Sequence, residues 1–261
     1  MSTVTYAPPL TGVPAPTKPS LPLLVSVEIR KLVDTRSGRW LVAAILLLSV
    51  AVNVLMLAFS PDDSLRAAQL LQITLVPSSL LLPVLGILTV TTEWSQRTAL
   101  TTFSLVPSRG RVVAAKLIAA TGWALVTVVF AIAVALVATA LVNAFDLGSG
   151  DYTLTAGALG GSVLNQIIGT LLGVGFGLAL LNTPFAIVLF FVLPTASSIV
   201  SETVPRIAEA WHWFDINWAT SPLLDGHMTG ELWGQVVVAG SIWVLLPIAF
   251  GTWRVLHREI A

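Results

Sequence analysis

The stretch from Tyr152 to Ser201 constrains this chain most, because its fifty residues include no Asp, Glu, Lys or Arg. A helix needs about 20 apolar residues to cross the hydrocarbon core of a bilayer. The stretch therefore predicts two membrane spans, and the polar, proline-closed sequence Asn182-Thr183-Pro184 indicates the turn between them. We expect an integral membrane protein.

The composition of the whole chain agrees with that prediction. Hydrophobic residues make up 56% of the chain and charged residues only 10%, whereas soluble globular chains carry roughly 25% charged residues. The formal net charge is zero, which argues against a nucleic-acid partner. The sequence contains no cysteine, so disulfides, thiol nucleophiles and cysteine metal sites are excluded.

Six apolar runs free of charge predict six membrane-spanning helices, because backbone groups in lipid must be hydrogen-bonded internally. The expected spans are residues 40–59, 73–92, 117–142, 154–181, 185–201 and 233–253. They predict an all-α integral membrane domain over residues 23–261. Residues 1–22 hold six of the fifteen prolines and predict a disordered cytoplasmic tail.

The basic residues are distributed unevenly between the predicted loops. Eleven of the thirteen fall on one side of the membrane, and only Arg66 and Arg206 fall on the other. Loops rich in Lys and Arg usually face the cytoplasm, so both termini are expected to be cytoplasmic.

The segment Leu24–Arg36 precedes the first predicted span and is too short to be a span itself. Its apolar residues recur at helical spacing: Val25, Ile29, Leu32 and Val33. This pattern predicts an amphipathic helix in the cytoplasmic interface. A basic flank that only orients the first span is the alternative.

The longest predicted cytoplasmic loop runs from Glu93 to Lys116. Its apolar residues Leu100, Phe103 and Leu105 are expected to dock into a groove on a cytosolic partner. The alternative is a loop whose basic residues only determine topology. Ser108 is predicted to be the N-cap of the third span.

The first half of the chain resembles ABC-2-type transporter permeases. The resemblance in topology covers the whole chain, and the motif lies within residues 27–117. The residues that carry it are Glu28-Ile29-Arg30-Lys31, Glu93-Trp94, Thr98, Pro107-Ser108-Arg109 and Ala115-Lys116-Leu117. Arg97 departs from the pattern, because many relatives have glycine before the threonine.

The resemblance implies the membrane subunit of a bacterial ABC exporter in the plasma membrane, paired with a second such subunit. It implies an elbow helix containing Glu28, Arg30 and Lys31. It also implies a segment that couples to a separate cytosolic ATPase subunit, and its residues are Glu93, Trp94, Arg97, Thr98, Leu100, Phe103, Leu105, Pro107 and Arg109. ATP and Mg²⁺ are expected on that partner, because the chain has no Walker A pattern, and no enzymatic activity is expected in the chain itself.

Glycines recur every four residues in the fourth predicted span, at Gly169, Gly173 and Gly177. Small residues at this spacing let helix backbones approach closely. The pattern predicts either tight packing within the chain or a dimer face.

The outer segment 202–232 is rich in aromatic residues. Trp211, Trp213, Phe214 and Trp218 are expected to form an interfacial belt, or alternatively an outer gate over an exit path. In the permeases that the chain resembles, this stretch forms short helices that dip back into the membrane. His212 and His227 with scattered acids do not predict a metal site.

Two further functions remain alternatives to an ABC permease. An ion-coupled secondary carrier is disfavoured, because the predicted spans contain no ionisable residue. A membrane anchor or sensor that docks a cytosolic partner is the other alternative. The polar side chains within the spans, among them Asn53, Asn165 and Gln166, suit a lipid-like, amphipathic or drug-like substrate better than a bare ion.

Overall fold

The protein is described by a computed structural model over residues 19–59, 66–96, 98, 108–145 and 150–257. Every secondary-structure element in these ranges is helical. The short or outlying helices are α1 (Leu21–Asp34), α8 (Ala208–Trp211) and α9 (Ile216–Asp225). The helices long and apolar enough to cross a membrane are α2 (Arg36–Phe59), α3 (Ala67–Ser95), α5 (Arg109–Ala144), α6 (Ala156–Leu180), α7 (Thr183–Thr203) and the continuous stretch α10 (Gly230–Gly240), η1 (Ser241–Leu245) and α11 (Leu246–His257).

These six candidate spans confirm the number and order that the apolar runs predict. The helices extend beyond those runs, most clearly α5, which begins at Arg109 rather than at residue 117. Charged residues do not stop a helix. A boundary drawn at the last charged residue before an apolar run therefore places the start of the helix too late. Ser108 is the N-cap residue of α5, but its side chain makes no capping hydrogen bond.

The last two residues of the predicted tail, Leu21 and Pro22, belong to α1, which begins at Leu21. Pro22 lies in the first turn of α1, where its missing N–H removes no helical hydrogen bond. Thr35 has extended backbone angles and separates α1 from α2. Gly38 lies so close to the carbonyl of Leu32 that a larger residue there would displace the junction.

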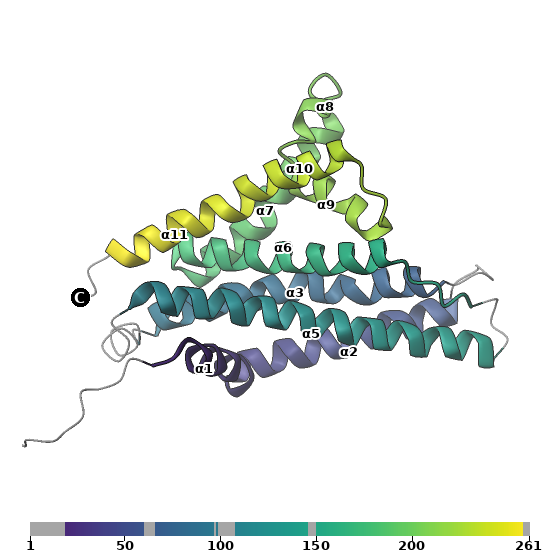
Figure 1. Ribbon diagram of the computed structural model, residues 1–261, viewed down its shortest axis with the longest axis horizontal. Helices are drawn as coiled ribbons and strands as arrows, with labels where there is room; N and C mark the ends of the chain where they lie inside the picture. The colour runs from purple at the N-terminus through teal and green to yellow at the C-terminus, as the bar shows by residue number, and fades with distance from the viewer. Residues whose placement is uncertain (1–18, 60–65, 97, 99–107, 146–149, 258–261) are drawn as a thin grey trace, which may run out of the picture.

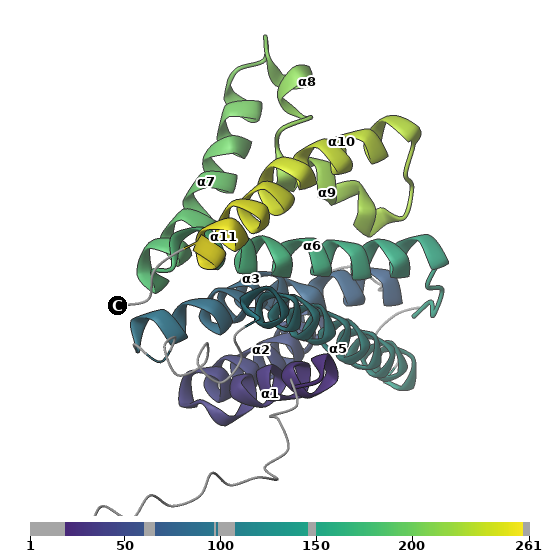
Figure 2. The same cartoon turned by 60° about the vertical axis from the view of Figure 1, so that its left-hand side comes forward.

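The pair α3 and α6 forms the centre of the bundle. About half of the apolar window of each helix is buried, 56% for α3 and 50% for α6, against 17% for α2 and for α7. In both views α1, α2 and α5 lie on one side of this pair, and α7, α10 and α11 lie on the other (Figure 1 and Figure 2). The apolar surface that α2 and α7 leave exposed is what lipid or a second subunit would cover.

The glycine repeat of α6 explains how closely α3 and α6 approach. A side chain at Gly173 would collide with the backbone of Pro83, and one at Gly177 would lie 3.2 Å from the backbone of Ile87. These two glycines therefore pack within the chain, and the prediction of a dimer face is wrong for them. A Cβ atom at Gly169 meets no atom within 4 Å.

Replacing Gly173 with leucine is expected to destabilise the protein, because the larger side chain forces α6 away from α3. Overpacking of this kind typically costs about 1–3 kcal/mol. The thermal midpoint of the purified variant, followed by size-exclusion chromatography after heating, measures the loss. Gly169→Leu is the matched control, and an equal loss in both variants would contradict the packing role of Gly173.

The segment between α7 and α10 folds back onto the bundle through α9. A side chain at Gly161 would collide with the carbonyl of Leu223, so α6 and α9 also approach backbone to backbone. Asp215, which is buried, caps α9 by accepting hydrogen bonds from the backbone N–H groups of Asn217 and Trp218. It also accepts hydrogen bonds from the hydroxyl groups of two serines of α7, Ser198 and Ser201. The segment between the fifth and sixth spans is therefore well packed in its α9 part.

Candidate functional site

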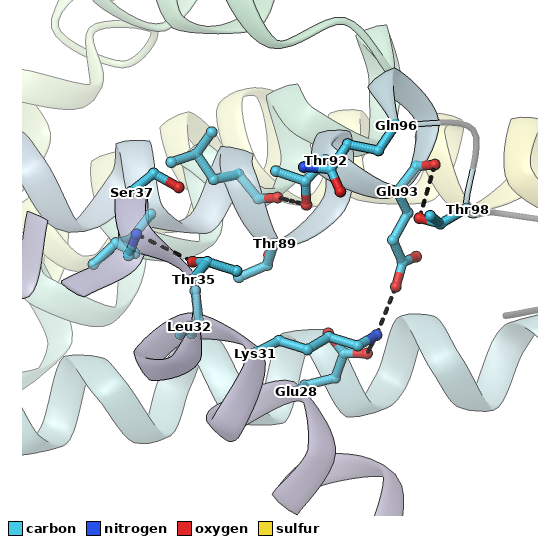
Figure 3. A pocket seen from close by; sticks show the side chains of 13 residues that line it. Glu28, Lys31, Leu32, Thr35, Ser37, Thr89, Thr92, Glu93, Gln96 and Thr98 are labelled. Atoms are coloured by element: carbon cyan, nitrogen blue, oxygen red, sulfur yellow. Dashed lines mark hydrogen bonds and ion pairs between the residues drawn. The ribbon is translucent and has the colours of Figure 1, made fainter. Parts of the chain in front are cut away.

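Four charged side chains from three helices meet at the end of the bundle that carries α1. Lys116 Nζ of α5 lies 2.9 Å from Glu28 Oε2 of α1 and 3.1 Å from Glu93 Oε1 of α3. Lys31 Nζ of α1 lies 2.8 Å from Glu28 Oε1 and 2.7 Å from Glu93 Oε1. Each ammonium group thus contacts both carboxylates, and we call these four residues the ion cluster. Figure 3 shows three of them, Glu28, Lys31 and Glu93.

Three members of the ion cluster are almost fully removed from solvent. The side chains of Glu28, Glu93 and Lys116 are 5%, 8% and 4% exposed, whereas that of Lys31 is 42% exposed. Lys116 Nζ also donates a hydrogen bond to the carbonyl oxygen of Thr89 at 2.7 Å. Buried charges are tolerated when they are paired and hydrogen-bonded, and the formal charges of this cluster sum to zero. The cluster therefore joins α1 to α3 and α5.

The electrostatics of the cluster keep Lys31 protonated. Burial by itself lowers the pKa of this amine, but the carboxylates of Glu28 and Glu93 outweigh burial and raise the pKa above its ordinary value. The positive charge of Lys31 is therefore present throughout the physiological pH range.

A cavity of about 350 Å³ lies beside the ion cluster, between α1, α2 and α3. Its walls carry the hydroxyl groups of Thr35, Ser37, Thr89, Thr92 and Thr98 (Figure 3). The backbone N–H of Thr98 donates to the carbonyl oxygen of Glu93 at 2.9 Å, so the chain leaving α3 stays next to the cluster. This places the start of the predicted coupling segment at the mouth of the cavity.

The structure gives two predicted coupling residues internal contacts. Glu93 belongs to the predicted coupling segment, and its carboxylate is buried in the ion cluster. Trp94 packs against the apolar core formed by residues such as Val90 and Val112. Both residues hold the end of α3 in place.

Arg109 connects the beginning of α5 to the end of α11. Its Nη1 donates to the carbonyl oxygens of Val255 and Leu256, at 2.9 and 3.4 Å. A cation near the last carbonyls of a helix also interacts favourably with the helix dipole. The other predicted coupling residues lie outside the described residues: Arg97, Leu100, Phe103, Leu105 and Pro107.

The helix α1 turns Glu28 and Leu32 toward the bundle, while Arg30, Ile29 and Val33 are exposed. Of the four apolar residues that suggested an amphipathic helix, Ile29 and Val33 are thus exposed, Val25 is partly exposed and Leu32 is buried. The contact with the bundle is made by Leu32 and by the charged residue Glu28, and the periodicity of apolar residues does not reveal the second. Lys116 was likewise assigned to a loop, although it lies inside α5. One sequence feature could have indicated this contact: the acidic Glu93 directly follows the apolar run 73–92, and the basic Lys116 directly precedes the run 117–142.

The outer aromatic residues connect the segment 202–232 to the spans. Trp211 Nε1 donates to the carbonyl oxygen of Ser197 at 3.0 Å, and Trp213 packs beside Gly234. The ring of Trp218 stacks on His212 at a centroid distance of 3.8 Å. The carbonyl oxygen of Phe214 accepts a hydrogen bond from Trp243 of η1. Phe214 and Trp218 remain exposed, and a role as an outer gate stays a prediction.

Two comparisons of the sequence with known proteins gave no match. No protein-family model matches the sequence, and no curated protein matches it. Within the described residues, no three His, Asp or Glu side chains gather in a way that could hold a metal ion.

Proposed function

We propose that this chain is the membrane-spanning subunit of an ATP-driven ABC transporter of the ABC-2 type. The observation that carries the proposal is the ion cluster. It is formed by four charged residues of the motif that resembles ABC-2 permeases, and these residues come from segments far apart in the sequence. A basic flank that only determines topology needs exposed cations, and it does not require two carboxylates and a lysine to be buried together.

The proposed mechanism uses the ion cluster as a rigid joint. The segment 96–108 connects α3 to α5, and both of these helices are joined to α1 by the cluster. Arg109 adds a connection to α11, and Arg254 connects α11 to the carbonyl oxygen of Ala179 in α6. A displacement of the segment by a partner ATPase would thus move several spans together, as in rigid-body domain motions.

In the proposed transporter, ATP and Mg²⁺ bind to separate cytosolic subunits and two membrane subunits form the path. The substrate is a lipid-like, amphipathic or drug-like molecule, and the direction is export. The membrane is the bacterial plasma membrane. The test is copurification of the tagged chain with an ATP-hydrolysing subunit, followed by ATP-dependent transport in proteoliposomes. An intact chain that copurifies with no ATPase would exclude the proposal and favour a carrier or a sensor.

An ion-coupled carrier is the second candidate, and the buried carboxylates of Glu28 and Glu93 favour it. Ionisable residues in a membrane protein often relay protons. The pairing of both carboxylates with two lysines argues against that role, because each carboxylate already contacts two ammonium groups within 3.1 Å. Transport that follows a proton gradient in the absence of ATP would support the carrier instead.

We expect both termini to be cytoplasmic. The end of the bundle that carries α1 also carries Lys31, Arg109, Lys116 and Arg254, in agreement with the positive-inside rule. A cytoplasmic reporter should be active when fused after Ala261, and a reporter that requires export should be active near Ser149 and near Met228. Activity of the exported reporter at Ala261 would exclude the proposed topology.

A further inference from the structure

A second cavity, of about 340 Å³, lies between α3, α6, α7 and α9. It contacts the middle of three candidate spans, at Ser79 of α3, Gly169 of α6 and Pro194 of α7. Ser79 and Thr195 are exposed at its mouth, while Gln166 and Thr170 are buried at its back. The cavity therefore opens sideways from the bundle at mid-depth, and it is separate from the cavity beside the ion cluster. We call it the lateral cavity.

Gln166 is the most unusual residue of the lateral cavity. It is 2% exposed, and within the described part of the chain neither its Nε2 nor its Oε1 has a hydrogen-bond partner. Burying an amide without partners is costly, and native proteins usually avoid it. By contrast, the buried amide Nδ2 of Asn53 donates to the carbonyl oxygen of Ser49 and to the hydroxyl of Thr74. Gln166 lines the lateral cavity, so an unused donor and an unused acceptor lie beside that space, although neither atom is open to solvent.

The remaining lining indicates the chemistry of that molecule. Among the described residues the lining contains no charged side chain, so an ion bound there would lack a counter-charge. Asn165 and Asn217 supply further amides, whereas Phe190, Phe191 and Leu172 supply apolar surface. A pocket of this size that combines apolar walls with polar groups is typical of small-molecule sites.

We propose that the lateral cavity binds an uncharged amphiphile, whose amide or hydroxyl groups pair with Gln166 and whose apolar part contacts Phe190 and Phe191. The ligand enters from the lipid phase through the mouth at Ser79 and Thr195. This inference rests on the proposed transport function, for which it defines the substrate class. The binding step needs no ATPase, so it can be tested separately from that function.

The test uses the absence of cysteine from the sequence. Thr195→Cys is placed in the otherwise cysteine-free chain, the protein is reconstituted in nanodiscs, and the rate of modification by N-ethylmaleimide is measured. Three amphiphiles with the same chain are compared: octyl glucoside, octyltrimethylammonium and octyl sulfate. Octyl glucoside at ten times its Kd is expected to slow the reaction about tenfold, because protection follows 1 + [L]/Kd. Octyltrimethylammonium and octyl sulfate should not slow the reaction. Val192→Cys, at an exposed position of α7, is the control and should not be protected by any of the three amphiphiles.

Two variants in the Thr195→Cys background test the role of the cavity wall. Gln166→Leu should abolish protection without loss of thermal stability, because it removes a buried amide that has no partner. Gly169→Leu should also abolish protection, because its side chain extends into the cavity without a clash. Gln235→Leu is the matched control and should retain protection, since Gln235 is also a buried glutamine with an unpartnered Oε1 but does not line the cavity.

Three results would overturn the inference. They are no protection by octyl glucoside, equal protection by all three amphiphiles, and protection that persists in both Gln166→Leu and Gly169→Leu. Equal protection by all three amphiphiles would mean that any lipid or detergent fills the cavity without selectivity for its headgroup. Failure of the inference with an intact ATPase complex would leave the transporter proposal standing. Protection by octyl glucoside in a chain that binds no ATPase would instead make the cavity the ligand site of a carrier.

Discussion

Lys116→Met is expected to lower the stability of the protein by about 3–5 kcal/mol, the usual cost of removing one partner from a buried ion pair. The lysine contacts both carboxylates of the ion cluster at 2.9 and 3.1 Å, and it also satisfies the carbonyl oxygen of Thr89. Its loss leaves Glu28 and Glu93 buried with one half-exposed ammonium group between them. The loss of stability is measured as a lower thermal midpoint in detergent, from the folded fraction that size-exclusion chromatography detects after heating.

A second substitution separates charge from packing in this experiment. Glu28→Gln added to Lys116→Met restores neutrality, because Glu93 keeps its 2.7 Å pair with Lys31. The double variant should therefore be more stable than Lys116→Met alone. Lys31→Met is the graded control: its side chain is half-exposed, water can replace it, and the loss should be smaller. A Lys116→Met protein as stable as the parent would show that the cluster does not hold α1 to the bundle.

Hydropathy was enough to predict the architecture. Six charge-free runs correspond to six candidate spans, because the need to bond every backbone group within lipid leaves the chain few other choices. The helix limits were less predictable. Arg109 and Lys116 belong to α5 although their charges exclude them from an apolar run, since a helix continues through polar headgroups and into water. Charged residues therefore mark where the hydrophobic part of a helix ends, but they do not mark where the helix itself ends.

The ion cluster could not be predicted from the sequence. Glu28, Glu93 and Lys116 lie on three helices, and their meeting depends on how α1 and α5 pack against α3. The resemblance selected these residues, but it placed Glu93 in a coupling segment and predicted no contact between Glu93 and Lys116. Sequence spacing shows which residues share a helix face and not which faces meet. The same limit applies to the glycine repeat of α6. Gly169 and Gly173 are equivalent positions of that repeat, but Gly169 lines a cavity and Gly173 packs against Pro83.

The largest effect on function is expected from the double variant Phe103→Asp with Leu105→Asp. Both residues lie outside the described residues, so the prediction depends on the sequence. Two large apolar side chains in a segment between spans are typical of a docking site. An apolar anchor at an interface often contributes about 2 kcal/mol or more, and roughly 1.4 kcal/mol corresponds to a tenfold change in affinity. Two charged replacements should therefore abolish copurification of the ATPase and ATP-dependent transport.

Membrane insertion provides the necessary contrast in that experiment. In the sequence, Phe103 and Leu105 lie between the apolar runs 73–92 and 117–142, so the level of protein in the membrane and its thermal midpoint should equal those of the parent. The matched control is the pair Val204→Asp with Ile207→Asp, two exposed apolar residues beside the outer helix α8, which should leave ATPase binding intact. If the Phe103 and Leu105 variant retains full ATPase association and transport, the segment does not couple to an ATPase. The ion cluster would then be a structural joint, and the carrier would become the better proposal.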